Sequence, residues 1–182
     1  MPWPETLQEQ FDIVTTFGEV DETEYYGPYN SLLSELFPGS EHFMIALKKR
    51  PTHPQYSDFY TLFIAQRRKH PVFLIQIRPS GHINNASDRA SADEQMRQWF
   101  DALYDKLSIP TLYGVSALGT KLCFYLYDSQ TGTLTPPAIE RDPIVANDRA
   151  PADRWNLDVM ESDGEQRMKE IVALVKKMCE EL

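Results

Sequence analysis

Apolar residues recur along the chain at two spacings, one typical of strands and the other of helices. The segment 72–78 is apolar almost throughout, which is typical of a strand buried on both faces in the middle of a sheet. The polar stretch Gln66-Arg-Arg-Lys-His70, followed by Pro71, predicts a turn before that segment. Strands are therefore expected at 42–48, 58–65, 72–78, 111–115 and 122–127.

Three segments carry apolar residues at helical spacing. The first runs from Pro28, which suits the first turn of a helix, to Pro38, which ends it. The second is 92–107, which has an apolar stripe on one side. The third is an amphipathic helix over 165–182. Charged residues at i,i+4 spacing lie opposite the stripe of the second helix: Asp93, Arg97 and Asp101.

The order helix, three strands, helix, two strands predicts an α/β fold with a central mixed sheet of about five strands flanked by helices. Residues 135–164 are rich in Pro, Asp, Asn and Arg and predict an irregular excursion around the core, with Trp155 as a candidate anchor. A length of 182 residues suits one domain. Its expected parts are an N-terminal arm (1–27), a core (28–128), an irregular excursion (129–164) and a C-terminal helix (165–182).

The composition is that of a globular protein, with 42% hydrophobic and 25% charged residues. No run reaches the roughly 18 apolar residues that a membrane helix needs, and the first residues lack the features of a secretory signal. We therefore expect an intracellular protein, cytoplasmic or nuclear, without a membrane partner. The formal charge of −9 opposes nucleic-acid binding, because neutralisation of the phosphate backbone dominates non-specific affinity.

Three polar residues are candidates for a site in the predicted sheet. Gln76 and Arg78 are two positions apart on the most apolar strand, so their side chains leave the same face of the sheet. Asp58 begins the preceding strand, and a hairpin turning near 66–71 would bring its carboxylate toward the same end. An acid, a polar acceptor and a cation would then converge.

Asp58, followed 18 positions later by Gln76-Ile77-Arg78 on an apolar strand with a helix behind it, resembles the PD-(D/E)XK nuclease motif. The resemblance covers about residues 28–128 and implies a restriction-endonuclease-like α-β-β-β-α-β core with an added C-terminal helix. It implies that acidic residues bind Mg²⁺ or Mn²⁺ and that the cationic residue positions the water for phosphodiester hydrolysis. The implied catalytic residues are Asp58, Gln76 and Arg78, and the implied metal ligands are Asp58, Gln76 and Glu35.

Two of these positions depart from the family pattern. Gln76 offers a carbonyl oxygen but no charge, which weakens cation binding. Arg78 keeps the positive charge, but its guanidinium stays protonated and positions water differently from a lysine amine. Together the two changes favour loss of hydrolysis. Glu24 is a further acidic candidate, and Gln95 with Trp99 resembles a Gln-x-x-x-Tyr element of some nucleases of this fold.

Three longer stretches are also similar to uncharacterised proteins of mushroom-type fungi, in which the third strand more often carries Glu-x-Lys. This likeness brings no known activity. The stretches are His70-Pro-Val-Phe-Leu-Ile-Gln-Ile-Arg-Pro79, Ala92-Asp-Glu-Gln-Met-Arg97 and Tyr113-Gly-Val-Ser-Ala-Leu-Gly-Thr120.

Several other reactive or metal-binding side chains lack the sequence pattern that a catalytic or metal site needs. The histidines do not have the spacing of a zinc site, and Ser116 lacks the second glycine of a Gly-x-Ser-x-Gly elbow. Cys123 and Cys179 are expected to be ordinary buried thiols. The basic run 66–70 is interpreted either as a phosphate-binding patch or as a solvated turn.

Three functions from different classes remain open. The first is a catalytically weakened or inactive nuclease-like domain that acts as a binding or interaction module, with nucleic acid or another protein as partner. In it, Asp58, Gln76 and Arg78 would form an internal hydrogen-bond network. The second is an active, divalent-metal-dependent nuclease. The third is a small-molecule enzyme that reuses the pocket of the fold.

Overall fold

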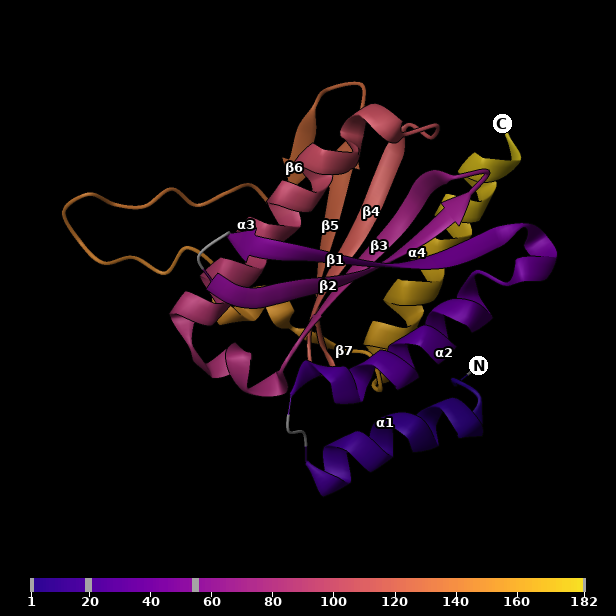
Figure 1. Cartoon of the computed structure of the whole chain (residues 1–182), viewed down its shortest axis with the longest axis horizontal. Coiled ribbons are helices and arrows are strands. Elements are labelled where there is room, and N and C mark those ends of the chain that lie inside the picture. Colours follow the sequence, from indigo (N-terminus) through magenta and orange to yellow (C-terminus); the bar gives the residue numbers. More distant parts are fainter. Residues whose placement is uncertain (1, 19–20, 54–55, 182) are drawn as a thin grey trace.

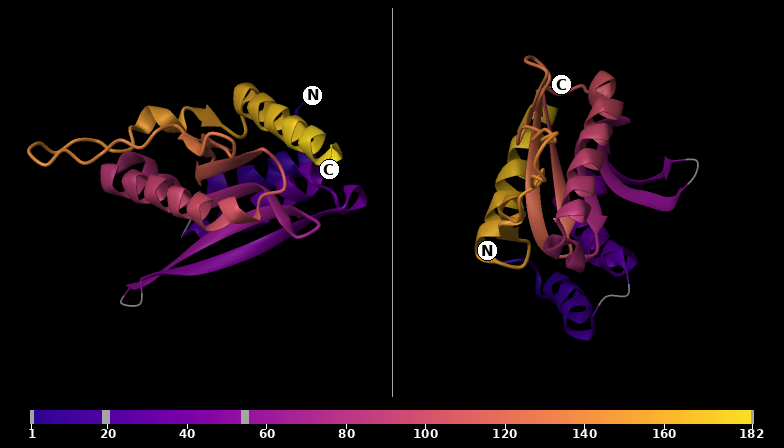
Figure 2. Two further views of the ribbon diagram at one scale, coloured as in Figure 1. Left: turned by 90° about the horizontal axis from the view of Figure 1, so that it is seen from above. Right: turned by 90° about the vertical axis from the view of Figure 1, so that its left-hand side faces the viewer.

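The five long strands expected from the sequence lie side by side in one mixed sheet (Figure 1). The computed structural model describes residues 2–18, 21–53 and 56–181, and for 49–53 and 56–61 it describes the backbone alone. Helices flank both faces of this sheet, so the fold is α/β (Figure 2). Two short strands, β6 (Thr133–Thr135) and β7 (Leu157–Asp158), extend the sheet beyond the five expected ones.

The longer elements follow one another in the expected order. The long strands are β1 (Phe43–His53), β2 (Tyr56–Arg67), β3 (His70–Arg78), β4 (Thr111–Leu118) and β5 (Lys121–Asp128). The α-helices are α1 (Glu5–Phe17), α2 (Tyr26–Leu36), α3 (Ala86–Leu103) and α4 (Ser162–Glu180). Short 3-10 turns connect them at Glu22–Tyr25, Gly39–Glu41, Ser80–Asn84, Tyr104–Lys106 and Ala152–Trp155.

The sheet combines a meander with one crossover. Strands β1, β2 and β3 pair antiparallel in sequence order. The chain then crosses through α3, and β4 pairs with β3 in parallel, because a parallel pair needs a long connection of this kind. Strand β5 pairs antiparallel with β4, and both short strands pair with β5. The central position of β3 explains its nearly continuous run of buried residues.

Strand β1 is longer than the sequence predicts. The sequence predicts a strand that ends at residue 48, but β1 continues through Pro51 to His53 and keeps pairing with β2, with a register shift between Pro51 and His53. Strand β1 is at the edge of the sheet, where a residue without an N–H group is tolerated. The β1–β2 hairpin therefore extends past the end of β3 and projects from the body of the molecule (Figure 2).

Each face of the sheet has its own hydrophobic core. Helices α1, α2 and α4 cover one face, where Phe73 and Ile75 of β3 are buried. Helix α3 covers the other face, where Leu74 of β3 is buried. Figure 2 shows α3 and α4 on opposite sides of the sheet. From Phe73 onward, alternate side chains of β3 thus enter alternate cores, as strand geometry requires.

The chain ends and the excursion are tied to these cores. Helix α1 packs its apolar side inward, and the Trp3 indole donates to the Val159 carbonyl at 2.7 Å. The segment between β6 and the last 3-10 turn forms a protruding irregular loop (Figure 1). Trp155 returns this segment to the α3 side of the sheet and is only 2% exposed. The anchoring role predicted for Trp155 is confirmed.

Among the residues that the structure describes, none of the helices combines the length and the apolar character needed to cross a membrane.

Candidate functional site

The predicted site residue Gln76 lies in a row of side chains that crosses the sheet beneath α3. The strand registers pair Leu62 of β2 with Gln76, Gln76 with Ser116 of β4, and Ser116 with Cys123 of β5. Leu62 and Cys123 belong to the core under α3, so Gln76 and Ser116 face the same helix. Both polar residues are almost fully buried, Gln76 at 1% exposure and Ser116 at 0%.

Helix α3 supplies hydrogen-bond partners to Gln76 and Arg78. The Gln76 amide nitrogen donates to the side-chain oxygen of Gln95, and Gln95 Nε2 donates to Ser91 Oγ at 2.9 Å. Arg78 Nη2 donates to the same Ser91 hydroxyl at 3.4 Å. Four residues from β3 and α3 are thereby joined in one chain of hydrogen bonds, a partly buried polar network of the kind that fixes one packing of strand against helix.

Two polar atoms in this row have no hydrogen-bond partner among the described groups. They are Gln76 Oε1 and Ser116 Oγ, both fully covered by protein atoms. Burying such a group without a partner costs about 1–3 kcal/mol. The row therefore contains acceptor and hydroxyl atoms that the described protein groups do not satisfy.

The sequence predicts that the Asp58 carboxylate lies near Gln76 and Arg78. The side chain of Asp58 is outside the described ones, so this prediction lies outside the described residues. The Asp58 backbone belongs to β2, four positions before Leu62. Leu62 is the first residue of β2 that pairs with β3, and its partner is Gln76. The backbone of Asp58 thus lies in the part of the β1–β2 hairpin that extends past β3.

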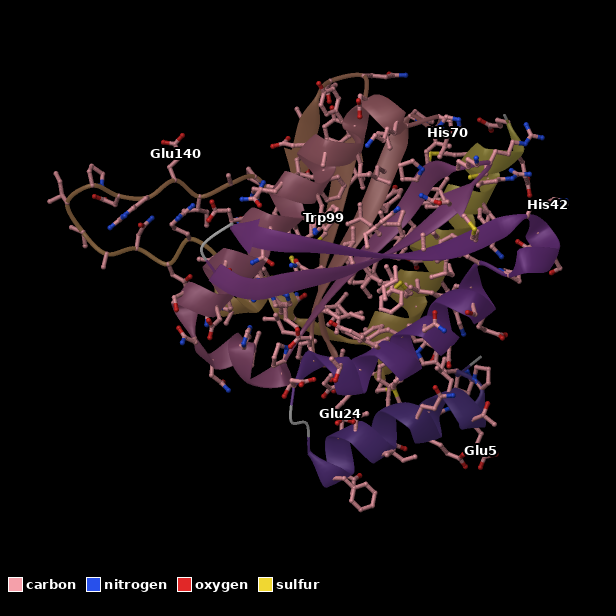
Figure 3. All side chains as sticks on the ribbon, viewed as in Figure 1. Glu5, Glu24, His42, His70, Trp99 and Glu140 are labelled. Atoms are coloured by element: carbon pink, nitrogen blue, oxygen red, sulfur yellow. The ribbon has the colours of Figure 1, made fainter. Side chains whose placement is uncertain are left out.

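The other acidic candidates lie elsewhere. Glu35 is exposed on α2, and it lines a cavity with Trp3 and with Lys169 and Lys176 of α4. That cavity is on the opposite face of the sheet from Gln76, because α2 and α4 cover that face. Glu24 is exposed in the turn before α2 (Figure 3). The structure does not bring Glu35 and Gln76 together.

The described residues do not fit a magnesium or manganese site at Gln76. A hard cation prefers several carboxylate oxygens, and Gln76 contributes one neutral carbonyl oxygen that points into the core. Nowhere in the described part of the chain do three His, Cys, Asp or Glu side chains gather as a ligand set. The expected ligand set of Asp58, Gln76 and Glu35 fails at Glu35, which lies across the sheet.

A second polar cluster, centred on Asp93, was not predicted as a buried site. Arg97 donates to both carboxylate oxygens, from Nε at 2.8 Å and from Nη2 at 3.0 Å. The Tyr125 hydroxyl and Arg154 Nη1 donate to Oδ1 at 2.8 and 3.1 Å. Burial, followed by the nearby Cys123 and Asp93, raises the pKa of Tyr125 far above its ordinary value. This phenol stays protonated as a donor.

Helix α3 holds the excursion through Arg89 as well. Its guanidinium donates to the carbonyls of Ala150 and Ile83 at 2.8 and 2.7 Å and pairs with Asp148 at 2.5 Å. Arg89, Asp93 and Arg97 follow one another at i,i+4 spacing on one side of α3. The spacing was visible in the sequence for the last two. Burial of this side was not, because the protruding loop that covers it is distant in sequence.

The comparisons with known proteins add no relative. No family model, curated protein or solved structure matches the chain. What the chain does must therefore be argued from its own residues.

Proposed function

We propose that this chain is a domain of the PD-(D/E)XK nuclease-like fold that has lost hydrolytic chemistry and acts as a binding or interaction module. The order of elements supports the fold part of the proposal. A helix precedes a three-stranded antiparallel meander, and a crossover helix leads to a strand parallel to the third one. This is the α-β-β-β-α-β order of that family's core.

One observation carries the loss of chemistry. The residue at the second acidic position of the motif, Gln76, is buried and hydrogen-bonded to Gln95 of the helix that covers it. A catalytic carboxylate in this place would need access to a cation and to a phosphate. Here the amide instead links strand to helix, and Arg78 extends the same network through Ser91. The motif strand is used for packing.

Exposed apolar side chains support an interaction role. On α1, Ile13 and Phe17 are 57% and 83% exposed, and their spacing puts them on one side of the helix. At the tip of the protruding loop, Ile144 and Val145 are 90% and 63% exposed. The tip is ordered by Asp142 Oδ1, which accepts from the backbone N–H groups of both residues at 2.7 and 3.0 Å. Each pair of exposed apolar side chains is a candidate contact point for a partner, because contact with a partner would remove these groups from water.

The test compares the wild type with a variant that restores the family's residue types, Gln76→Glu with Arg78→Lys. Mg²⁺ and Mn²⁺ are titrated into each protein by calorimetry, and cleavage of single- and double-stranded DNA and RNA is followed. The wild type is expected neither to bind metal nor to cleave. The double variant is expected to gain Mn²⁺ binding, because a carboxylate replaces a neutral amide.

Asp58→Ala is the control in both backgrounds. Metal binding gained by the double variant should disappear when Asp58 is removed, if Asp58 completes the site. Cleavage by the wild type that Asp58→Ala abolishes would overturn the proposal and establish an active nuclease. A double variant that folds, by circular dichroism, yet binds no metal would count against the nuclease-like placement of Gln76 and Arg78.

A further inference from the structure

A basic cavity lies at the opposite end of β3 from Gln76 and Arg78. It has a volume of ≈ 350 Å³ and opens where the β2–β3 turn meets the C-terminal end of α4. Figure 3 shows His70 in this region, well away from the protruding loop that carries Glu140. The cavity is outside the network of Gln76 and is not used by the proposed function. Its lining residues are Arg67, Arg68, His70, Ser108, Cys179 and Glu180.

Arg67 is held in a fixed place within this cavity. Its Nη1 donates to the carbonyl of Cys179 near the end of α4, and its guanidinium lies 5.9 Å from the centre of the Phe43 ring. A guanidinium presents five N–H donors in a planar fork. A side chain already oriented by the protein loses little freedom when it binds an anion. Arg67 is thus a preorganised donor.

The turn places cations where its backbone would favour other residues. Arg68 and Lys69 both have positive φ, at 50° and 69°, as in a two-residue hairpin turn of the type that prefers Asn-Gly. Side chains other than those of Gly, Asn and Asp are strained in this region. Arg68 and Lys69 are both exposed in this turn, so hydrophobic burial does not account for these two residues and their charges are accessible to a ligand.

His70 also lines this cavity. Its Nδ1 lies 2.9 Å from the Lys106 carbonyl oxygen, and because a carbonyl oxygen only accepts, Nδ1 carries the hydrogen in this contact. The hydrogen bond to the Lys106 carbonyl thus fixes the orientation of the ring. Nε2 donates to an anion when the imidazole is protonated. Ser108, also in the lining, adds a hydroxyl donor.

We propose that this cavity binds a small ligand through a phosphate group, with Arg67, Arg68 and His70 as its main contacts. The size is at the lower end of cavities for small molecules, which fits one or two phosphate groups with a small organic part. An extended polyanion fits less well, since the chain carries a formal charge of −9 and Glu180 lies in the lining. The carboxylate of Glu180 repels an anion and so limits the affinity of the cavity for phosphate. It favours a ligand whose phosphate contacts the two arginines.

The decisive variant is Arg68→Asn with Lys69→Gly, which removes both turn cations and installs the preferred turn sequence. It should fold at least as stably as the wild type, so lost binding cannot be attributed to unfolding. Inorganic phosphate and pyrophosphate are titrated into each protein by calorimetry at low salt. Pyrophosphate should bind the wild type and should bind this variant at least tenfold more weakly. Glu180→Gln should bind it severalfold more tightly.

A matched control removes the same number of charges elsewhere, by Lys48→Gln with Arg141→Gln, both exposed and outside the cavity lining. Its affinity for pyrophosphate should equal that of the wild type within about twofold. The proposal fails if 10 mM pyrophosphate does not bind the wild type, or if the turn variant binds as the wild type does. It also fails if a twelve-nucleotide single-stranded DNA displaces bound pyrophosphate at a lower concentration than unlabelled pyrophosphate does, because the site would then bind nucleic acid.

Discussion

Asp93 and Arg154, 61 positions apart in the sequence, form an ion pair of 3.1 Å beneath the irregular excursion. Arg154 also donates to the Pro137 carbonyl at 2.8 Å, and Arg97 donates to the Pro136 carbonyl at 2.9 Å. One carboxylate therefore orients two guanidinium groups, and these bind the backbone where the excursion begins. The long segment after β6 is held against α3 by charge-assisted hydrogen bonds.

Replacing Asp93 with Ala is expected to destabilise the protein by about 3–5 kcal/mol, the usual effect of leaving a buried charge without its partner. The side chains of Arg97 and Arg154 are only 19% and 13% exposed, so water does not readily replace the carboxylate. Urea unfolding measures the loss. Hydrogen exchange should rise first at residues 136–149, because their anchors are released.

Asp101→Ala is the matched control for this prediction. Asp101 is two turns further along α3 and is exposed, so its removal should change stability by no more than about 0.5 kcal/mol. Equal effects of the two substitutions would mean that Asp93 is solvated and that the excursion is held by other contacts.

The sequence predicted the repeating parts of this fold and missed parts that depend on distant segments. The strand runs and the apolar stripes of α3 and α4 follow local periodicity, so these elements could be placed, with α3 ending at Leu103 rather than at 107. The predicted length of the first strand was too short. A strand can contain Pro51 only where the missing N–H is not needed for pairing, and the edge position of β1 that allows this depends on the whole sheet. The shared burial of Gln76 and Ser116 depends on strand register, which the spacing of either residue alone does not reveal.

The candidate site was predicted in part for the same reason. Period-two geometry placed Gln76 and Arg78 on one face, and both contact α3 as neighbours of Ser91 and Gln95. Glu35 was expected as a further acidic group on the first predicted helix, but sequence gives no information on which face of a sheet that helix covers. Only the packing of α2 showed that Glu35 lies on the other side.

Two serines near Gln76 should respond to alanine in opposite directions. Ser116 Oγ is buried without a described partner, so Ser116→Ala removes an unsatisfied hydroxyl and should stabilise the protein by up to about 1 kcal/mol. Ser91 Oγ accepts from Gln95 and Arg78, so Ser91→Ala should destabilise it by about 1–2 kcal/mol. Urea unfolding of both variants measures the two changes.

Each serine is the control for the other, since both substitutions remove the same atom from the same side of the sheet. A loss of more than about 1 kcal/mol on Ser116→Ala would show that this hydroxyl bonds to an internal water molecule, which buried polar pairs commonly hold. If Ser91→Ala leaves the free energy of unfolding unchanged, the hydrogen bonds of Ser91 do not contribute to holding β3 against α3.

The last prediction concerns pH and the Cys123 thiol, which follows Ser116 in the buried row. Burial is the main cause that raises the pKa of Cys123 from 9.0 to about 12. The folded protein therefore holds this proton more tightly than the unfolded chain does. The resulting stability is complete below about pH 9 and is lost as pH rises toward 12.

Between pH 9 and pH 10.5, the thiol should cost the wild type up to about 1.4 kcal/mol of stability for each pH unit. Cys123→Ala should reduce this slope. The slopes are compared, and not the stabilities at pH 7, because removal of the buried sulfur also changes packing. Comparing the two slopes by urea unfolding cancels the contribution of Tyr125 and Tyr29, whose pKa values are also raised. Identical slopes would mean that the Cys123 thiol ionises as readily in the folded protein as in the unfolded chain, and that the row beneath α3 is open to water.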